Sequence, residues 1–229
     1  MPAYRFFLDQ HFVLHESYEL PSQEAHHIFK VMRCQVGEIL EFVNGQGQMA
    51  CAQLIDAHTI QVNTLLQEPP PPELIVAQAL IKPNRLDSIL EKGTELGMTQ
   101  LWLFEAEKSE KSGLSNQQAI RLNHLSIAAL KQCGRLDLPK ILIVPPLLKW
   151  TSLPCTSYYG SLNPQDPWLI DLIQPKQPSL FLVGPEAGLT QAEQSHLNQL
   201  GAQAAKLHRY TLRAETAPLV ALSLLSQKY

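Results

Sequence analysis

The sequence predicts a chain of two parts, in which a small, mostly β module precedes a larger α/β domain built on a parallel sheet. Four consecutive prolines in QEPPPPE, residues 67–73, cannot join a sheet ladder and favour a stiff, extended linker. After this linker, short apolar runs alternate with helical patterns, which is typical of parallel strands covered by helices on both faces. We therefore expect domains over residues 1–70 and 74–229.

The first seventy residues predict short strands around one helix. YRFFL at 4–8 has the composition of a strand, and Ser22 could cap a helix that runs through Arg33. In the stretch 38–55, two strand-like runs flank Asn44-Gly45, a pair that favours a tight hairpin turn. A module of this size lies near the lower limit for independent folding.

The segment after the linker predicts strands and helices in alternation. Its clearest start signal is Thr190, because Glu193 completes a capping box with it. Gly97 and Gly134 follow helical patterns and predict their ends. The predicted strands are 74–80, 100–106, 179–184 and 202–207, and the predicted helices are 85–97, 115–133, 190 onward and about 217 onward.

Length and composition indicate a soluble, globular protein. The 229 residues suffice for a real core, and no apolar stretch approaches the length of a membrane span. The four cysteines form no CxxC pair, which argues against a zinc site and a disulfide framework. We therefore expect reduced thiols, no bound metal and a cytoplasmic location.

Charge is distributed unevenly along the chain. The whole carries a formal charge of −3, and residues 1–72 hold three Lys or Arg against eight Asp or Glu. A general nucleic-acid binder usually has a basic footprint, and this first part has none by formal charge. Five of the eight histidines lie there, which offsets the deficit only where they are protonated.

A first candidate binding loop is GPEAG, residues 184–188, which follows an apolar strand. Its two glycines allow a sharp turn close to a ligand at the carboxyl end of that strand. The helix after Thr190 would favour an anion, but the carboxylate of Glu186 would repel phosphate. No GxGxxG pattern and no P-loop pattern occurs, so we expect a neutral or cationic ligand, with a solvated surface turn as the alternative.

A second candidate loop lies in LHRYTLRAETAPLVALSLL, residues 207–225, and also follows a predicted strand. It places Arg213 and Glu215 just before a helix with an early Pro218. The alternative interpretation is a charged connection in which Arg213 and Glu215 form a surface ion pair. Two polar loops at the same end of one sheet favour a binding site.

Five motifs match the pattern of one known family, in order and over most of the chain. GPEAGLTQAE at 184–193 is similar to GPEGG with a glutamate five residues later, and LRAETAPLVAL at 212–222 is similar to LR-x-ETA-x-x-AL. The others are KQCGRLDLP at 131–139, IKPNRLDSILEKGTELGMTQLW at 81–102, and HHIFKVMRCQVGE with NGQG within 26–47. They resemble the RsmE family, the SPOUT-class methyltransferases that methylate N3 of a uridine in 16S ribosomal RNA.

The resemblance implies a PUA-like β-barrel for RNA, followed by an α/β SPOUT domain with a C-terminal trefoil knot. It implies S-adenosylmethionine as the cofactor, 16S ribosomal RNA of the small subunit as the partner, a homodimer and no membrane attachment. The cofactor-binding residues that it implies are Leu182, Gly184, Pro185, Glu186, Gly188, Leu207, Tyr210, Leu212, Thr216 and Ala217.

The chemistry of the implied reaction assigns two further residues. Uridine N3–H must lose its proton before N3 attacks a methyl group, and the anion then spreads over the flanking carbonyl oxygens. Arg213 is the candidate that stabilises this anion, with Glu215 orienting Arg213 or serving as the base. Glu186 would accompany a cationic cofactor, since S-adenosylmethionine carries a sulfonium.

The chain departs from the family pattern within the implied cofactor loops. Ala187 and His208 replace common glycines, Tyr210 replaces arginine and Ala214 replaces threonine. Arg85 could contact RNA phosphate or be solvated. Two alternatives stay open: a non-catalytic RNA- or ribosome-binding relative, and an α/β enzyme that acts on a small molecule through the same loops.

Overall fold

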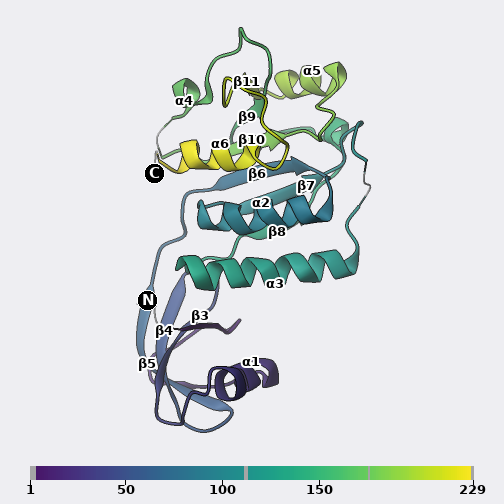
Figure 1. Ribbon diagram of the computed structural model, residues 1–229. Coiled ribbons are helices and arrows are strands. Elements are labelled where there is room, and N and C mark those ends of the chain that lie inside the picture. Colours follow the sequence, from purple (N-terminus) through teal and green to yellow (C-terminus); the bar gives the residue numbers. More distant parts are fainter. Residues whose placement is uncertain (1–3, 111–112, 175, 228–229) are drawn as a thin grey trace. The chain divides into compact units, whose positions relative to one another are not determined.

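The computed structural model describes residues 4–110, 113–174 and 176–227, and these divide into two compact units (Figure 1). Unit 1 comprises the described residues up to Pro71 together with Ile127–Leu138, and unit 2 comprises the remaining described residues. Prolines 69–72 are exposed and belong to no helix or strand.

Unit 1 is built on a five-stranded sheet with the order β1-β3-β4-β5-β2. Its strands are β1 (Arg5–Phe7), β2 (Ser17–Glu19), β3 (Ile39–Val43), β4 (Gln48–Leu54) and β5 (Thr59–Gln67). β1 pairs in parallel with β3, and the other neighbours are antiparallel. Phe6, Phe12 and Phe42 form its core with Ile28.

The hairpin predicted around Asn44-Gly45 forms between β3 and β4. Asn44 Oδ1 accepts hydrogen bonds from the backbone N–H groups of Gln46 at 2.8 Å and Gln48 at 3.1 Å. Gly45 has a φ of +72°, which glycine adopts without strain. The hairpin turn therefore forms at Asn44-Gly45, through the side-chain hydrogen bonds of Asn44 and the positive φ of Gly45.

The predicted helix near residue 22 is confirmed only in part. α1 (Ser22–His26) passes into a π-helical turn, η1 (His27–Val31), so the helical stretch ends before Arg33. The N-cap is Pro21 and not Ser22, and its side chain makes no capping hydrogen bond. The expectation that Ser22 caps the helix was wrong, because Ser22 is itself the first helical residue.

The carboxyl-terminal part of α3 (Asn116–Cys133) belongs to unit 1. Leu130 and Leu136 pack with Val43, and the Gly47 N–H donates to the Leu136 carbonyl at 2.9 Å. The boundaries expected from the linker counted residues 127–138 with the second domain, so the structure differs from them at this segment. A division inside a continuous helix leaves no sign in the sequence.

Unit 2 is a six-stranded sheet, parallel throughout, with the order β11-β9-β10-β6-β7-β8. Its strands are β6 (Leu74–Ala79), β7 (Gln100–Phe104), β8 (Lys140–Ile143), β9 (Thr156–Gly160), β10 (Ser179–Val183) and β11 (Gln203–Ala205). The sequence patterns do not predict β8 and β9. The parallel sheet confirms the α/β fold class.

Helices cover both faces of this sheet. On one face, α2 (Pro83–Glu95) and α6 (Ala217–Ser226) contact each other and bury Val76 and Phe181, and α4 (Leu169–Leu172) contacts α6. On the other face, α5 (Gln191–Gln199) and the 3-10 turn η2 (Leu147–Lys149) share a core with Ile75 and Leu182. β6 and β10 are buried on both faces, which explains their continuous apolar runs. No helix in the described part of the chain is long and apolar enough to cross a membrane.

The capping box predicted for Thr190 is present at the start of α5. Thr190 Oγ1 accepts from the Glu193 N–H at 3.2 Å, and Glu193 Oε2 accepts from the Thr190 N–H at 2.8 Å. The buried Glu193 carboxylate also accepts from the Glu107 N–H at 2.9 Å. One side chain thus joins the start of α5 to the segment after β7.

Candidate active site

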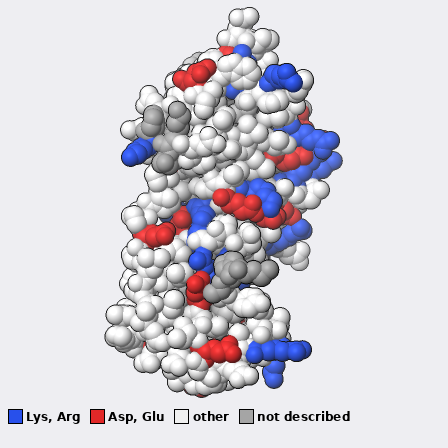
Figure 2. Space-filling view, turned by 60° about the vertical axis from the view of Figure 1, so that its left-hand side comes forward, with Lys and Arg blue, Asp and Glu red and all other residues white. Residues whose placement is uncertain are grey.

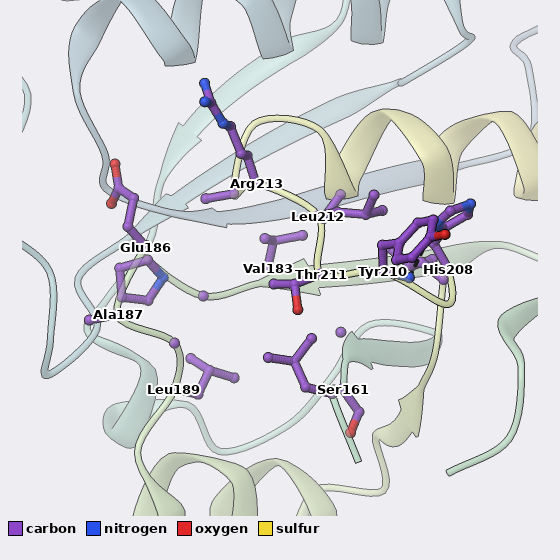
Figure 3. A pocket seen from close by; sticks show the side chains of 18 of the residues that line it. Ser161, Val183, Glu186, Ala187, Leu189, His208, Tyr210, Thr211, Leu212 and Arg213 are labelled. Carbon is purple, nitrogen blue, oxygen red and sulfur yellow. Dashed lines mark hydrogen bonds between the residues drawn. The ribbon is translucent and has the colours of Figure 1, made fainter. Parts of the chain in front are cut away.

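A cavity of about 620 Å³ opens at the carboxyl ends of β9 and β10 in unit 2 (Figure 3). It is lined by residues 160–162 at the end of β9, residues 183–189 at the end of β10, and most of residues 207–214 before α6. Ligands of open parallel sheets bind outside the carboxyl ends of the strands. A cavity of this volume suits a small organic cofactor.

Most of the residues predicted for the site line this cavity. Leu182, Glu215 and Thr216 do not, and Leu182 is buried in the core on the α5 face, since side chains alternate along β10. The predicted residues that line the cavity are Gly184, Pro185, Glu186, Gly188, Leu207, Tyr210, Leu212, Arg213 and Ala217.

Sequence reasoning missed the contribution of residues 160–162, because it did not predict β9. The run TSYYG at 156–160 is rich in β-branched and aromatic residues, a signal that could have predicted this strand. Val183 and Leu189 were also missed, although they flank GPEAG. Arg85 was considered only as a possible phosphate contact, yet it lines the cavity from α2.

The backbone of the GPEAG loop explains its two glycines. Gly188 has a φ of +72° and donates its N–H to the Pro185 carbonyl at 2.8 Å. A side chain at Gly184 would place its Cβ 2.9 Å from Leu189 Cγ, so the loop packs too tightly there for any other residue. Ala187 is not among the described residues with positive φ, so it replaces a glycine without backbone strain.

Four charged side chains gather beside the cavity. Arg85 Nη1 lies 2.7 Å from Glu186 Oε1 and 3.6 Å from Glu215 Oε2. Arg213 Nη1 lies 4.0 Å from Glu215 Oε1. The Glu186 carboxylate is therefore paired with a cation of the protein, which differs from its expected role beside a cationic cofactor.

An exposed aromatic pair lies at the edge of the cavity. Tyr210 is 63% exposed, and its ring centroid lies 5.5 Å from that of His208 and 4.6 Å from the Arg209 guanidinium. The Tyr210 N–H donates to His208 Nδ1 at 3.2 Å, and Figure 3 shows the two side chains next to each other. The two departures from the family pattern at His208 and Tyr210 thus form one joint arrangement.

The cavity fits S-adenosylmethionine by its volume and by its lining. Val183, Leu189, Leu207 and Leu212 offer apolar contacts suited to a purine ring, and the close approach of backbone at Gly184 offers peptide groups for hydrogen bonds. Among the described residues, no cluster of His, Cys, Asp and Glu is arranged to hold a metal ion.

Both parts of the chain match families of known proteins. Residues 68–226 match the RNA methyltransferase domain family, and residues 20–65 match the RNA methyltransferase PUA domain. The chain is 29% identical over 231 residues to the ribosomal RNA small subunit methyltransferase E of Bacillus subtilis, covering 92% of this chain and 90% of the relative. It is also 29% identical to the protein of that name from Synechocystis, covering 96% of this chain and 76% of the relative.

Solved structures agree with this placement. A ribosomal RNA small subunit methyltransferase E from Neisseria gonorrhoeae, bound to S-adenosyl methionine, is 27% identical with a TM-score of 0.83, and the match covers 96% of this chain and 95% of that one. A probable rRNA-methyltransferase from Porphyromonas gingivalis is 26% identical with a TM-score of 0.78, and the match covers 90% and 91%.

A PUA-like module followed by a parallel-sheet α/β domain, with a cavity at the strand ends, defines an RNA-modifying methyltransferase. The chain belongs to the RNA methyltransferase domain family, whose match spans most of its length.

Proposed function

We propose that this protein transfers the methyl group of S-adenosylmethionine to N3 of a uridine in 16S ribosomal RNA of the small subunit. The names of its relatives and the cofactor bound to the Neisseria structure support this proposal. The observation that carries it is the cavity, which both motif loops form together at the ends of β9 and β10.

The lining residues would hold the cofactor, which supplies an electrophilic methyl group. Gly184 and Gly188 let the backbone of the loop approach it closely, while Leu207 and Leu212 provide apolar contacts. Leu182 would act indirectly, by packing in the core with Leu189. Thr216 would act through its N–H, which donates to the Arg213 carbonyl at 2.9 Å. The remaining requirement for transfer is proximity of the two reactants with water excluded.

Arg213 would stabilise the negative charge that develops on the uracil ring. Its side chain is 81% exposed and belongs to a residue that lines the cavity, so it is accessible to a base that enters from solvent. A guanidinium near the two carbonyl oxygens of uracil would favour the deprotonated ring. Glu215 is better suited to orient Arg213 than to take the proton, because each of its oxygens faces an arginine.

Unit 1 would dock on the ribosomal RNA. Figure 2 shows one face of the molecule, on which Lys and Arg side chains lie beside Asp and Glu, and no broad surface of one sign covers that face. RNA can be recognised through its shape and a few local cations as well as through a basic stripe.

We further propose a cytoplasmic homodimer with a trefoil knot in the C-terminal domain, as the family resemblance implies.

The proposal is tested in cells from which the gene has been deleted. Nucleosides released from their 16S ribosomal RNA should lack 3-methyluridine, and a plasmid copy of the gene should restore it. Calorimetry with the purified protein should show binding of S-adenosylmethionine. If the deletion leaves 3-methyluridine unchanged and the protein does not bind the cofactor, the proposed function is wrong.

A further inference from the structure

Arg85 contacts both of the motif loops that form the cavity. It lies in the first turn of α2, and its Nη1 atom lies 2.7 Å from Glu186 Oε1 in the GPEAG loop. The same atom lies 3.6 Å from Glu215 Oε2, in the segment that leads into α6. One guanidinium on a helix therefore joins two segments that are far apart in the sequence.

These three side chains are partly buried, so each charge depends on an opposite charge nearby for its stabilisation. The exposed fractions are 29% for Arg85, 31% for Glu186 and 19% for Glu215. Glu215 Oε2 is buried and accepts no hydrogen bond within the described part of the chain, so Arg85 is the cation that balances it. A buried carboxylate oxygen that loses its counter-charge is strongly unfavourable.

We propose that Arg85 is a positioning residue of the methyl-transfer site, which holds the GPEAG loop and the segment before α6 in one arrangement. It fixes Glu215, and Glu215 in turn faces Arg213 at 4.0 Å. It also neutralises two carboxylates that would otherwise repel an anionic uracil and the RNA backbone. The inference rests on the proposed function for its catalytic consequence, but not for the coupling of the two loops.

The first test is hydrogen exchange on the free protein, which does not depend on any activity. In Arg85→Met, the amides of residues 184–189 and 207–216 should both exchange about tenfold faster or more, because a partly buried charged contact is lost. Arg121→Met is the matched control, since Arg121 pairs with the Asp87 carboxylate of α2 and its side chain is 66% exposed. Its exchange in both segments should stay at the wild-type level.

The second test is calorimetry with S-adenosylmethionine. Arg85→Met should bind it about tenfold more weakly, Arg85→Lys should recover part of that loss, and Arg121→Met should bind normally. Glu186→Gln should add little to Arg85→Met, because both changes break the same contact.

Two different results would contradict the positioning role of Arg85 and the proposed function. Unchanged exchange in both segments of Arg85→Met would overturn the positioning role. A wild-type protein that binds no cofactor, with faster exchange in the variant, would instead contradict the proposed function and leave the coupling of the loops supported.

Discussion

Arg213 and Glu215 face each other across 4.0 Å, but they differ sharply in exposure. The Arg213 side chain is 81% exposed, whereas the Glu215 side chain is 19% exposed and also faces Arg85. Because the Arg213 side chain is mostly in solvent, its attraction to Glu215 is screened and contributes little to stability. Since Glu215 is itself held by Arg85, it gives Arg213 a fixed partner, while the Arg213 guanidinium remains accessible to a substrate.

Arg213→Ala should lower turnover by about 10²-fold or more, because a charge-stabilising contact in the transition state is lost. S-adenosylmethionine affinity should stay nearly unchanged, and the free energy of unfolding should fall by less than about 1 kcal/mol. Methyl-transfer kinetics, calorimetry and urea unfolding check the three values. Wild-type turnover, or a defect in cofactor affinity alone, would remove Arg213 from the catalytic residues.

Variants of Tyr210 test whether its ring contacts the substrate or the cofactor. Because Tyr210 is 63% exposed, we expect its ring to stack on an RNA base. Tyr210→Ala should raise the KM for small subunits about tenfold, the range of one lost base–aromatic stack, and Tyr210→Phe should not. Calorimetry that finds weaker cofactor binding in Tyr210→Ala would instead support its place among the cofactor-binding residues predicted from the sequence.

Thr190→Ala should lower the free energy of unfolding by about 1 kcal/mol, because it removes the N-cap of α5. Gln191→Ala is the control, since Gln191 is the exposed first residue of the same helix. Urea unfolding monitored by circular dichroism measures both. Equal stability of the two variants would show that the capping box contributes nothing measurable.

The raised pKa of the Cys155 thiol predicts that the free energy of unfolding depends on pH. Burial raises the pKa of its thiol from 9.0 to about 11, and the Glu73 carboxylate adds to the effect. Its thiolate therefore forms more readily in the unfolded chain, so this contribution to stability is complete below pH 9.0 and is lost as the pH rises towards about 11. The difference in free energy of unfolding between the wild type and Cys155→Ala should shrink over that range. A difference that stays constant from pH 8 to 11 would rule out the effect.

The C-terminal helix α6 predicts self-association. Pro218, Leu222 and Leu225 are buried within the chain, whereas Leu219 and Leu224 remain half-buried. This leaves apolar surface that a second copy could cover. Light scattering at micromolar concentration should give twice the chain mass of 25.7 kDa, and Leu219→Arg should shift the mass towards the monomer. A monomeric wild type would exclude the homodimer.

Local signals in the sequence predicted much of the fold. The hairpin at Asn44-Gly45 and the cap at Thr190 depend on residues within a few positions of each other, and both are confirmed. β6 and β10 were predictable because burial on both faces demands continuous apolar runs. β5 was missed, since its last four residues are exposed and its pattern fades there.

The candidate site was predictable to the extent that it lies in continuous motifs. GPEAG and four residues of LRAETA line one cavity, whereas Glu215 and Thr216 do not. The pairing of Arg85 with Glu186 joins residues 101 positions apart. No spacing rule predicts a contact of that kind, because it depends on how α2 packs beside α6 on one face of the sheet. The role expected for Glu186 beside a cationic cofactor did not include this pairing with Arg85.

The central claim is tested most directly by transfer of a labelled methyl group from S-adenosylmethionine to small ribosomal subunits purified from cells that lack this gene. Wild-type protein should place label in 16S ribosomal RNA, and digestion should recover that label as 3-methyluridine. Subunits from cells that carry the gene should accept little, and Arg213→Ala should transfer far more slowly. Wild-type protein that binds S-adenosylmethionine but places no label in these subunits would contradict the account.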